Sequence, residues 1–202
     1  LHTAYRRQRQ MCIRDRLYGV QTLRGIENFS ISKFRLSEYP LFIKGLAITK
    51  MAAAMANFEL GLLTVEQKDA IIAACGEILD GKHHDQFPVD MIQGGAGTTT
   101  NMNANEVIAN RALELMGHER GEYHYCSPND HVNCSQSTND AYPTAIHIGM
   151  YFKHLQLLPH LEELIASFRK KGEEFSQIIK MGRTQLAVSY THLRAHETDS
   201  YL

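Results

Sequence analysis

The chain has 202 residues, a formal net charge of −1, and 44% apolar and 21% charged residues. These values fit one large or two small domains of a soluble globular protein with a sizeable core. The near-neutral charge provides no field that favours nucleic acid or a membrane surface, and no run reaches the roughly eighteen apolar residues of a membrane span.

The first sixteen residues, LHTAYRRQRQMCIRDR, carry five arginines and little apolar pattern. They fit either a basic arm for nucleic acid or targeting, or a segment that is foreign to the fold. The far end of the chain, described below, favours the second interpretation. From Tyr18 the sequence becomes typical of a folded domain, and residues 18–29 predict an extended segment followed by a turn.

Two helices are predicted next. The first runs from about Pro40 to Leu62 and has apolar residues at helical spacing. Thr64 and Gln67 then form a capping box for the second helix, which is expected to end at Asp80 before a glycine.

The cysteines and histidines do not indicate a metal site. The cysteines are Cys12, Cys75, Cys126 and Cys134. Without a CxxC pair or a secretory leader, they favour free thiols in a cytoplasmic protein, and Cys75 is expected in the core. The cluster at 83–85, His-His-Asp, has no further ligand at useful spacing, so exposed loop histidines are the favoured interpretation.

Residues 93–103, QGGAGTTTNMN, form a glycine-rich turn that leads into hydroxyls and amides. A helix is predicted to follow from about Asn103 to Met116. Glycines allow a backbone to approach a ligand closely, but GGAG lacks the spacing of a dinucleotide fingerprint and no P-loop lysine is present. By itself, the stretch is also explained by a simple helix-initiating turn.

The most polar stretch is NDHVNCSQSTND at 129–140, in which Val132 is the single aliphatic residue. It cannot be core, because a buried amide or hydroxyl without a partner costs a few kcal/mol. Residues 137–140 are all good N-cap residues at the start of a long helix. Free N–H groups at a helix start, beside hydroxyls and an amide, suit a carboxylate or phosphate. A capped loop and an anion site are both open at this point.

The longest predicted element is a helix from about Asp140 to Ile179, whose apolar residues repeat at spacings of three, four and seven. Pro159 is expected to kink or interrupt it. The apolar stripe needs partners, supplied either by the smaller domain or by a bundle with further sequence and other subunits. After a polar turn at 180–186, residues 187–202 show neither helical nor strand periodicity.

Four stretches in register resemble the fumarase/aspartase superfamily, and within it the aspartases. They are residues 18–28, GGAGTTTNMNANEV at 94–107, residues 127–144 with SQSTND, and KMGRTQL at 180–186. The resemblance covers roughly residues 17–186 and implies a mainly α fold. It implies a helical N-terminal domain at 17–139, the first long helix of a central bundle with its following turn at 140–186, and non-native tails at 1–16 and 187–202. The family pattern fails directly after Leu186, which is why the tails are interpreted as foreign.

The family implies reversible anti-elimination of ammonia from L-aspartate to give fumarate, in a cytoplasmic homotetramer without a cofactor or metal. In the family, a serine on a mobile loop takes the Cβ proton, and neutral donors hold the resulting aci-carboxylate. That loop is not in this sequence, so no catalytic base is assigned and the chain alone is expected to be inactive. The expected partner is a small dicarboxylate, L-aspartate or fumarate, with no nucleic acid and no membrane.

The site residues implied by the resemblance occupy matching positions of the motifs. The substrate-binding set is Thr98, Ser137, Thr138, Asn139, Thr184 and Gln185. Thr98, Ser137 and Thr138 match the hydroxyls that hold the β-carboxylate of the substrate. Asn139 matches the amide near the substrate's amino group. Thr184 and Gln185 match the pair that meets the opposite end of the substrate. Asn129 and Asp130 match a secondary dicarboxylate site of fumarases, but Ser127 replaces a histidine there, which argues against a working second site.

Two alternatives are left open. Gln185 and the GGAG sequence favour aspartases, whereas fumarases carry histidine at position 185, so a fragment of a class II fumarase is the alternative within the family. From another class, a non-catalytic helical interaction protein would recruit partners through its long helix. A nucleic-acid binder would need basic or aromatic interleaving outside the N-terminal arginines, which the sequence lacks.

Overall fold

The computed structural model describes residues 16–93 and 95–179. These residues are mainly α-helical, which confirms the predicted fold class, and their single β feature is an isolated bridge between Arg35 and Asp90. The chain divides into two compact units, Leu1–Leu155 and Gln156–Leu202. The division falls inside the last helix, whereas the sequence places a boundary where that helix begins. The tails predicted to be foreign lie almost wholly outside the described residues.

The first unit contains all the described helices except the part of the last helix that follows Leu155. Its helices are α2 (Val20–Asn28), α3 (Pro40–Glu59), α4 (Val65–Leu79) and α5 (Thr98–Leu115). The short turns η1 (Leu36–Glu38), η2 (His84–Gln86) and η3 (Pro128–Val132) connect them, and α6 (Thr138–Phe175) begins in this unit.

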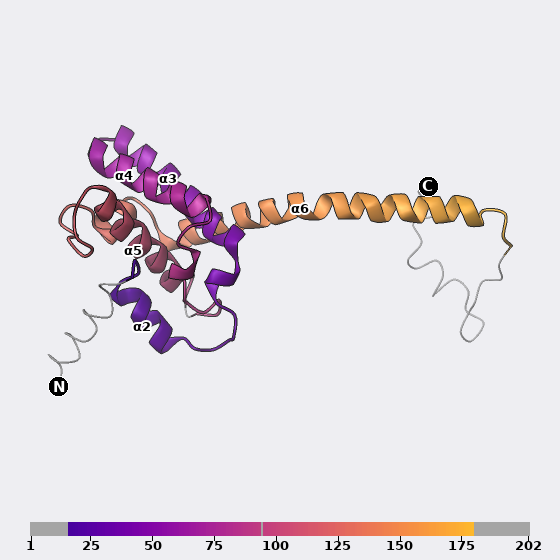
Figure 1. Cartoon of the computed structure of the whole chain (residues 1–202), viewed down its shortest axis with the longest axis horizontal. Helices are drawn as coiled ribbons and strands as arrows, with labels where there is room; N and C mark the ends of the chain where they lie inside the picture. Colours follow the sequence, from indigo (N-terminus) through magenta and orange to yellow (C-terminus); the bar gives the residue numbers. More distant parts are fainter. Residues whose placement is uncertain (1–15, 94, 180–202) are drawn as a thin grey trace. The chain divides into compact units, whose positions relative to one another are not determined.

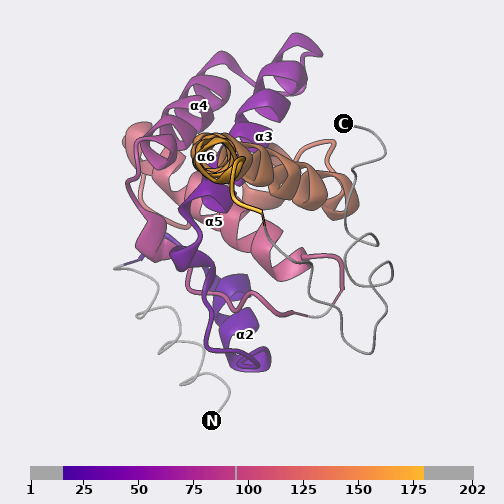
Figure 2. The same ribbon diagram turned by 90° about the vertical axis from the view of Figure 1, so that its right-hand side faces the viewer.

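Helix α5 is the centre of the first unit, with α3 and α4 on one side and α2 on the other (Figures 1 and 2). Its Val107, Ile108 and Leu113 are fully buried, as are Ile43 of α3 and Ile71 of α4. Each such side chain contributes roughly 1.5–3 kcal/mol by leaving water. The core therefore lies where α3, α4 and α5 meet.

The prediction of an extended segment at 18–29 was wrong, because residues 20–28 form helix α2. The N-terminus of α2 is held by the Glu106 carboxylate of α5. Oε2 accepts hydrogen bonds from the N–H groups of Gly19 (2.9 Å) and Thr22 (3.0 Å) and from the Thr22 hydroxyl (2.6 Å), and Oε1 accepts from Gln21 N–H (2.9 Å). A distant side chain thus acts as the helix cap, which no local pattern at 18–29 reveals.

Helix α3 begins at Pro40, as predicted, but ends at Glu59 rather than near Leu62. It is the one described helix that is long and apolar enough, by length and composition, to cross a bilayer. The sequence expectation missed it because two lysines interrupt the apolar run. However, 44% of that stretch is buried inside the protein, and core helices meet the same criterion.

The capping box of α4 is confirmed. Thr64 Oγ1 accepts a hydrogen bond from Gln67 N–H (3.2 Å), and Gln67 Oε1 accepts one from Thr64 N–H (3.1 Å). The helix ends at Leu79 with Asp80 as its C-cap, as expected. Cys75 is completely buried, and burial raises the pKa of its thiol to about 12, so it is a protonated core residue.

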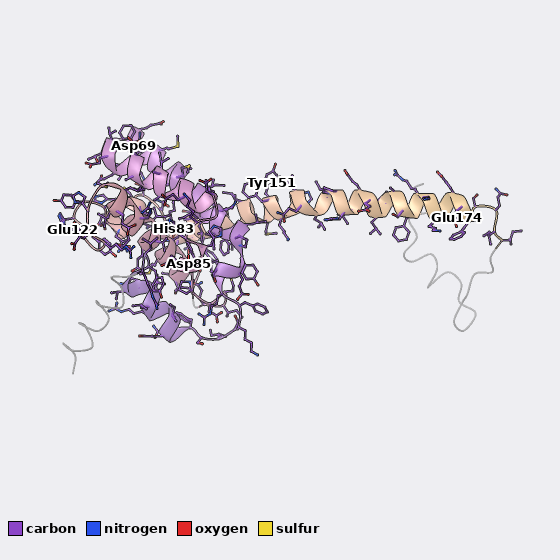
Figure 3. All side chains as sticks on the ribbon, viewed as in Figure 1. Asp69, His83, Asp85, Glu122, Tyr151 and Glu174 are labelled. Carbon is purple, nitrogen blue, oxygen red and sulfur yellow. The ribbon has the colours of Figure 1, made fainter. Side chains whose placement is uncertain are left out.

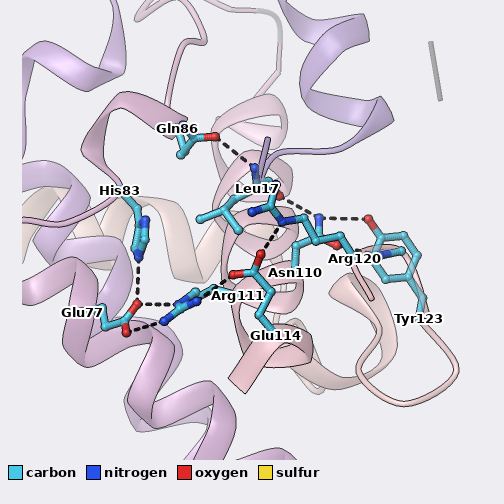
Figure 4. A network of polar contacts seen from close by, with 10 residues as sticks. Leu17, Glu77, His83, Gln86, Asn110, Arg111, Glu114, Arg120 and Tyr123 are labelled. Atoms are coloured by element: carbon cyan, nitrogen blue, oxygen red, sulfur yellow. Dashed lines mark hydrogen bonds and ion pairs between the residues drawn. The ribbon is translucent and has the colours of Figure 1, made fainter. Parts of the chain in front are cut away.

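An ion-pair network joins α4 to α5 (Figure 4). Arg111 donates to both carboxylate oxygens of Glu77, at 2.6 and 2.8 Å, and to Glu114 at 2.7 Å. His83 Nε2 lies 2.8 Å from Glu77, and His84 Nε2 lies 2.9 Å from the Ile78 carbonyl oxygen. The pair predicted as exposed loop histidines is therefore half-buried and hydrogen-bonded.

Metal ligation finds no support in residues 16–93 and 95–179, because no group of three or more histidine, cysteine, aspartate or glutamate side chains is placed to hold an ion.

Helix α6 runs from Thr138 to Phe175 and continues through Pro159, which was expected to kink or interrupt it. In the second unit, every described residue from Gln156 onward is exposed. Its apolar side chains include Leu157, Leu164 and Phe168, which are 50%, 51% and 70% exposed. Figure 3 shows the side chains along this helix, where Tyr151 and Glu174 are labelled.

Replacing Glu106 with glutamine should destabilise the protein by roughly 2–4 kcal/mol. The neutral amide offers one acceptor where the carboxylate has two, and its NH2 group would face the N–H groups of α2. The measurement is urea unfolding followed by circular dichroism, with the exposed Glu59→Gln as the control, expected to change stability by less than about 0.5 kcal/mol. Equal stabilities for the two variants would contradict the capping role.

Acid should weaken the protein through Glu77. The hydrogen bonds from Arg111 lower the pKa of this carboxyl from 4.5 to about 2. Because the folded-state pKa lies below the unfolded value, the stabilisation is complete above about pH 4.5 and is lost as the pH falls toward 2. Unfolding measured across this range should show Glu77→Gln with a shallower pH dependence than the parent, whereas the exposed Glu119→Gln keeps the parental slope.

Candidate functional site

The first part of the candidate site is the glycine-rich turn and the start of α5. The helix begins at Thr98, five residues before the predicted Asn103, because Gly97 adopts a left-handed conformation (φ 84°) that serves as its N-cap. Gln93 completes the turn, since its Oε1 accepts from Thr100 N–H (3.0 Å) and its Nε2 donates to the Thr100 hydroxyl. Thr98 is left exposed in the first turn, among backbone N–H groups that have no helical acceptor.

The second part is the polar stretch before α6, which is more ordered than a plain loop. Ser127 caps a π-helical turn at Pro128–Val132, because its Oγ accepts from Asp130 N–H (3.2 Å) and donates to Asp130 Oδ2 (2.7 Å). Val132 is buried and anchors the turn in the core. The Asp130 carboxylate therefore already has a partner in Ser127, at the position where a histidine was expected in a secondary site.

The third part is the first turn of α6. Ser137 is the N-cap among the four candidates at 137–140: its carbonyl oxygen accepts from Asp140 N–H (3.1 Å) and Ala141 N–H (3.0 Å), and its Oγ accepts from Asn139 N–H (3.2 Å). Ser137 and Asn139 are exposed, and Thr138 is half-buried. Hydroxyl and amide groups therefore surround the positive end of a long helix, together with the exposed carboxylate of Asp140.

Two contacts bring the starts of α5 and α6 together. Asn101 Nδ2 donates to Thr138 Oγ1 (3.2 Å) and to Asn133 Oδ1 (3.0 Å). Gly97 lies so close to the Tyr142 ring that an added Cβ would stand 2.3 Å from it. The turn that carries Thr98 is thereby fixed against the turn that carries Thr138.

Two buried polar side chains of helix α3 hold the turn before α6 in place. Lys50 Nζ donates to Asn133 Oδ1 (2.9 Å), and Asn57 Nδ2 donates to the Cys134 carbonyl oxygen (2.8 Å). Burial lowers the pKa of Lys50 from 10.5 to about 7, and the Coulombic interaction with Cys75 opposes this shift. Two helix N-termini, several hydroxyls and a buried amine suit an anionic ligand.

The structure thus places four of the predicted substrate-binding residues at the adjoining starts of two helices. They are Thr98, Ser137, Thr138 and Asn139. Thr184 and Gln185 lie outside the described residues, and the secondary site at Asn129 and Asp130 stays a prediction. Sequence reasoning missed the residues that support the site from behind, namely Lys50, Gln93, Asn101 and Asn133. A lysine within an apolar, alanine-rich helix was the one signal that could have revealed part of this support.

These features define a mainly helical protein with a polar, anion-suited cluster at paired helix starts, and the chain belongs to a lyase family. The family model described as Lyase matches residues 9–195.

Within that family, the chain is similar to several aspartate ammonia-lyases. It is 55% identical to one from Helicobacter pylori over 193 residues, which are 95% of this chain and 41% of that protein. It is 56% identical to one from Escherichia coli K12 over 173 residues, 85% of this chain and 36% of the relative. The chain therefore spans well under half the length of these curated relatives.

Solved structures show the same fold. A structure titled fumarate lyase:delta crystallin from Brucella melitensis superposes with a TM-score of 0.80 at 53% identity, over 85% of this chain and 40% of that one. A class II fumarase from Schistosoma mansoni superposes with a TM-score of 0.74 at 40% identity, over 84% and 36% of the two chains.

Replacing Gly97 with alanine should destabilise the protein by roughly 2–5 kcal/mol, because the left-handed backbone and the clash with Tyr142 both oppose a Cβ. The matched control is Gly95→Ala, which has a similar φ of 71° but whose nearest heavy atom would lie 3.8 Å away, and which should cost about 1–2 kcal/mol. In a Tyr142→Ala background, the loss from Gly97→Ala should fall to that of the control. Chemical unfolding measures all four variants, and an undiminished loss would show that the ring contact is unimportant.

Proposed function

We propose that this chain is part of an aspartate ammonia-lyase, which eliminates ammonia from L-aspartate to give fumarate, and that its described residues form one wall of the dicarboxylate site. The observation that carries the proposal is the grouping of Thr98, Ser137 and Thr138 at the starts of two helices, held by Asn101. The similarity to curated aspartate ammonia-lyases over most of this chain supports it.

The reaction explains why neutral donors are useful at this wall. When a base removes a proton from Cβ, the electron pair moves into the neighbouring carboxylate, which then carries two negative charges. The pair returns to form the carbon–carbon double bond as the Cα–N bond breaks and ammonia leaves. Hydroxyls held in place before the reaction stabilise the doubly charged intermediate more than the substrate, and this difference lowers the barrier. No base is assigned to the residues of this chain.

The proposal also gives the protein partners. The exposed apolar side chains of α6 beyond Leu155 fit a helical bundle completed by further sequence and by other copies in a homotetramer. The proposed enzyme is cytoplasmic, in keeping with the free thiols of Cys75, Cys126 and Cys134. It uses no metal or organic cofactor, because the chemistry requires only a base, donors and a proton for the leaving group.

A class II fumarase is the second candidate, favoured by the similarity to the Schistosoma mansoni structure. Both reactions pass through the same kind of doubly charged carboxylate and differ in the group that leaves Cα. The described residues bind the carboxylate that both substrates share. The two functions are therefore distinguished by which substrate the enzyme converts, L-aspartate or L-malate.

The decisive experiment uses a full-length hybrid, in which residues 17–179 of this chain replace the matching segment of the Helicobacter pylori relative. We expect the purified hybrid to form fumarate from L-aspartate and not from L-malate. Thr98→Val and Thr138→Val should each lower kcat/KM by roughly 10²–10³-fold, whereas Thr49→Val, in α3, should leave it unchanged. The 202-residue chain alone should form no fumarate. A preference for L-malate, or full activity in both threonine variants, would refute the proposal.

A further inference from the structure

A line of hydrogen bonds runs from a buried lysine to the site. Lys50 Nζ donates to Asn133 Oδ1 (2.9 Å), which also accepts from Asn101 Nδ2 (3.0 Å). The same Asn101 Nδ2 donates to Thr138 Oγ1 (3.2 Å). Lys50 is fully buried and Asn101 is 2% exposed, whereas Asn133 and Thr138 are half-buried. Three helices and the turn before α6 are joined by this line.

The lysine sets the direction of every bond in the line. The ammonium form of Lys50 can only donate hydrogen bonds, so it holds the side-chain amide of Asn133 with its oxygen toward Nζ. That oxygen then attracts the NH2 group of Asn101, which places Nδ2 beside Thr138. A flipped Asn133 would bring three donor groups face to face. Asn133 Nδ2 donates in turn to the Gln136 carbonyl oxygen (3.1 Å), which favours the same orientation.

The direction of the line decides what Thr138 offers to a ligand. Because its oxygen accepts from Asn101, its own proton points elsewhere and is available as a donor. A carboxylate bound at the start of α6 needs such a donor, since it can only accept hydrogen bonds. Without Asn101 the hydroxyl could rotate and present its lone pairs to the anion.

An apolar side chain would fill the position of Lys50 without the cost of burying an amine. Cys75 on α4 is the titratable group that interacts electrostatically with it, and the thiol is protonated because burial raises its pKa to about 12. Burial lowers the pKa of Lys50 itself to about 7. An amine that is costly to bury and has no carboxylate partner within residues 16–93 and 95–179 is therefore explained by what it orients.

We propose that Lys50 is a positioning residue of the dicarboxylate site, which acts through Asn133 and Asn101 to hold the Thr138 hydroxyl as a donor toward the substrate carboxylate. Lys50 does not touch the substrate. The inference rests on the proposed function, because it assigns Thr138 to substrate binding.

The first test uses nuclear magnetic resonance of the 202-residue chain. As the pH rises through about 7, the side-chain amide signals of Asn133 and Asn101 should shift with the same midpoint as the Lys50 Nζ signal. The amide of Asn110, which donates to the Leu17 carbonyl oxygen (2.7 Å), is the control and should not follow. In Lys50→Met the shared midpoint should disappear. Amides that ignore the titration of Lys50 would overturn the inference.

The second test measures kinetics in the full-length hybrid. Lys50→Met should lower kcat by roughly 10–100-fold with little change in KM, because the oriented donor matters most for the doubly charged intermediate. Lys44→Met, on the same helix, is the matched control and should be fully active. Asn101→Leu should lower kcat similarly, and the double variant Lys50→Met/Asn101→Leu should be no worse than either single change, as expected for members of one line.

The outcomes separate the two proposals. A hybrid with Lys50 intact that forms no fumarate from L-aspartate would refute the proposed function and leave the amide titration to decide whether the line exists. An active hybrid whose Lys50→Met variant keeps its kcat, or a double variant with fully multiplied losses, would refute the positioning role alone. Circular dichroism confirms that each variant is folded, and should Lys50→Met fail to fold, the titration of the unmodified chain still decides.

Discussion

The structure depends on a set of polar side chains that α5 carries into the buried centre of the first unit. Glu106 binds the start of α2, Asn110 binds the Leu17 carbonyl oxygen, and Asn103 donates to the Gln86 carbonyl oxygen (3.0 Å). Asn101 Nδ2 donates to Asn133 Oδ1 in the turn before α6. Each of these donors and acceptors would cost roughly 1–3 kcal/mol if it were buried without a partner, so their contacts with the surrounding segments stabilise α5 in its buried position. Helix α5 therefore determines where its neighbours lie as well as how tightly they pack.

This constraint explains how a site is assembled from segments far apart in the sequence. The hydroxyl of Thr98 belongs to α5 itself, and that of Thr138 to α6, forty residues later in the chain. Asn101 connects the two directly, and the contact between Gly97 and Tyr142 leaves little freedom for either turn to move. Donors that are fixed before a ligand arrives need no rearrangement when charge develops on it, which is the physical basis of electrostatic catalysis. The same interactions that stabilise the fold thus also orient the donors.

The sequence predicted those features whose causes are local. The capping box at Thr64 and Gln67, the proline that opens α3 and the apolar stripe that buries Cys75 all depend on residues within a few positions of one another. Helix α2 was missed because its cap, Glu106, lies more than eighty residues away. The early start of α5 was missed for a related reason, since its N-cap is a glycine without a capping side chain and the nearby Gln93 supplies the bond.

The candidate site divides in the same way. Its hydroxyl and amide residues stand in dense polar motifs, and a reader of the sequence can find them. Its support depends on pairs such as Lys50 with Asn133, whose members are separated by the rest of the domain. Such pairs are determined by how α3 lies on the core, which periodicity does not specify. The residues that touch a ligand were therefore easier to predict than the residues that orient them.

Helix α3 shows that residues which orient the site can still be recognised in the sequence. Its composition satisfies the criterion for a membrane span, yet it carries two buried polar residues, Lys50 and Asn57, seven positions apart. Seven residues are about two helical turns, so both side chains lie on one face. Both donate to the same short segment, at Asn133 and Cys134. Polar residues repeated at this spacing in an otherwise apolar helix indicate that a protein segment with hydrogen-bond acceptors lies along that face, because lipid tails offer no acceptors. The same pattern that identifies α3 as a core helix therefore also points to the segment that forms the site.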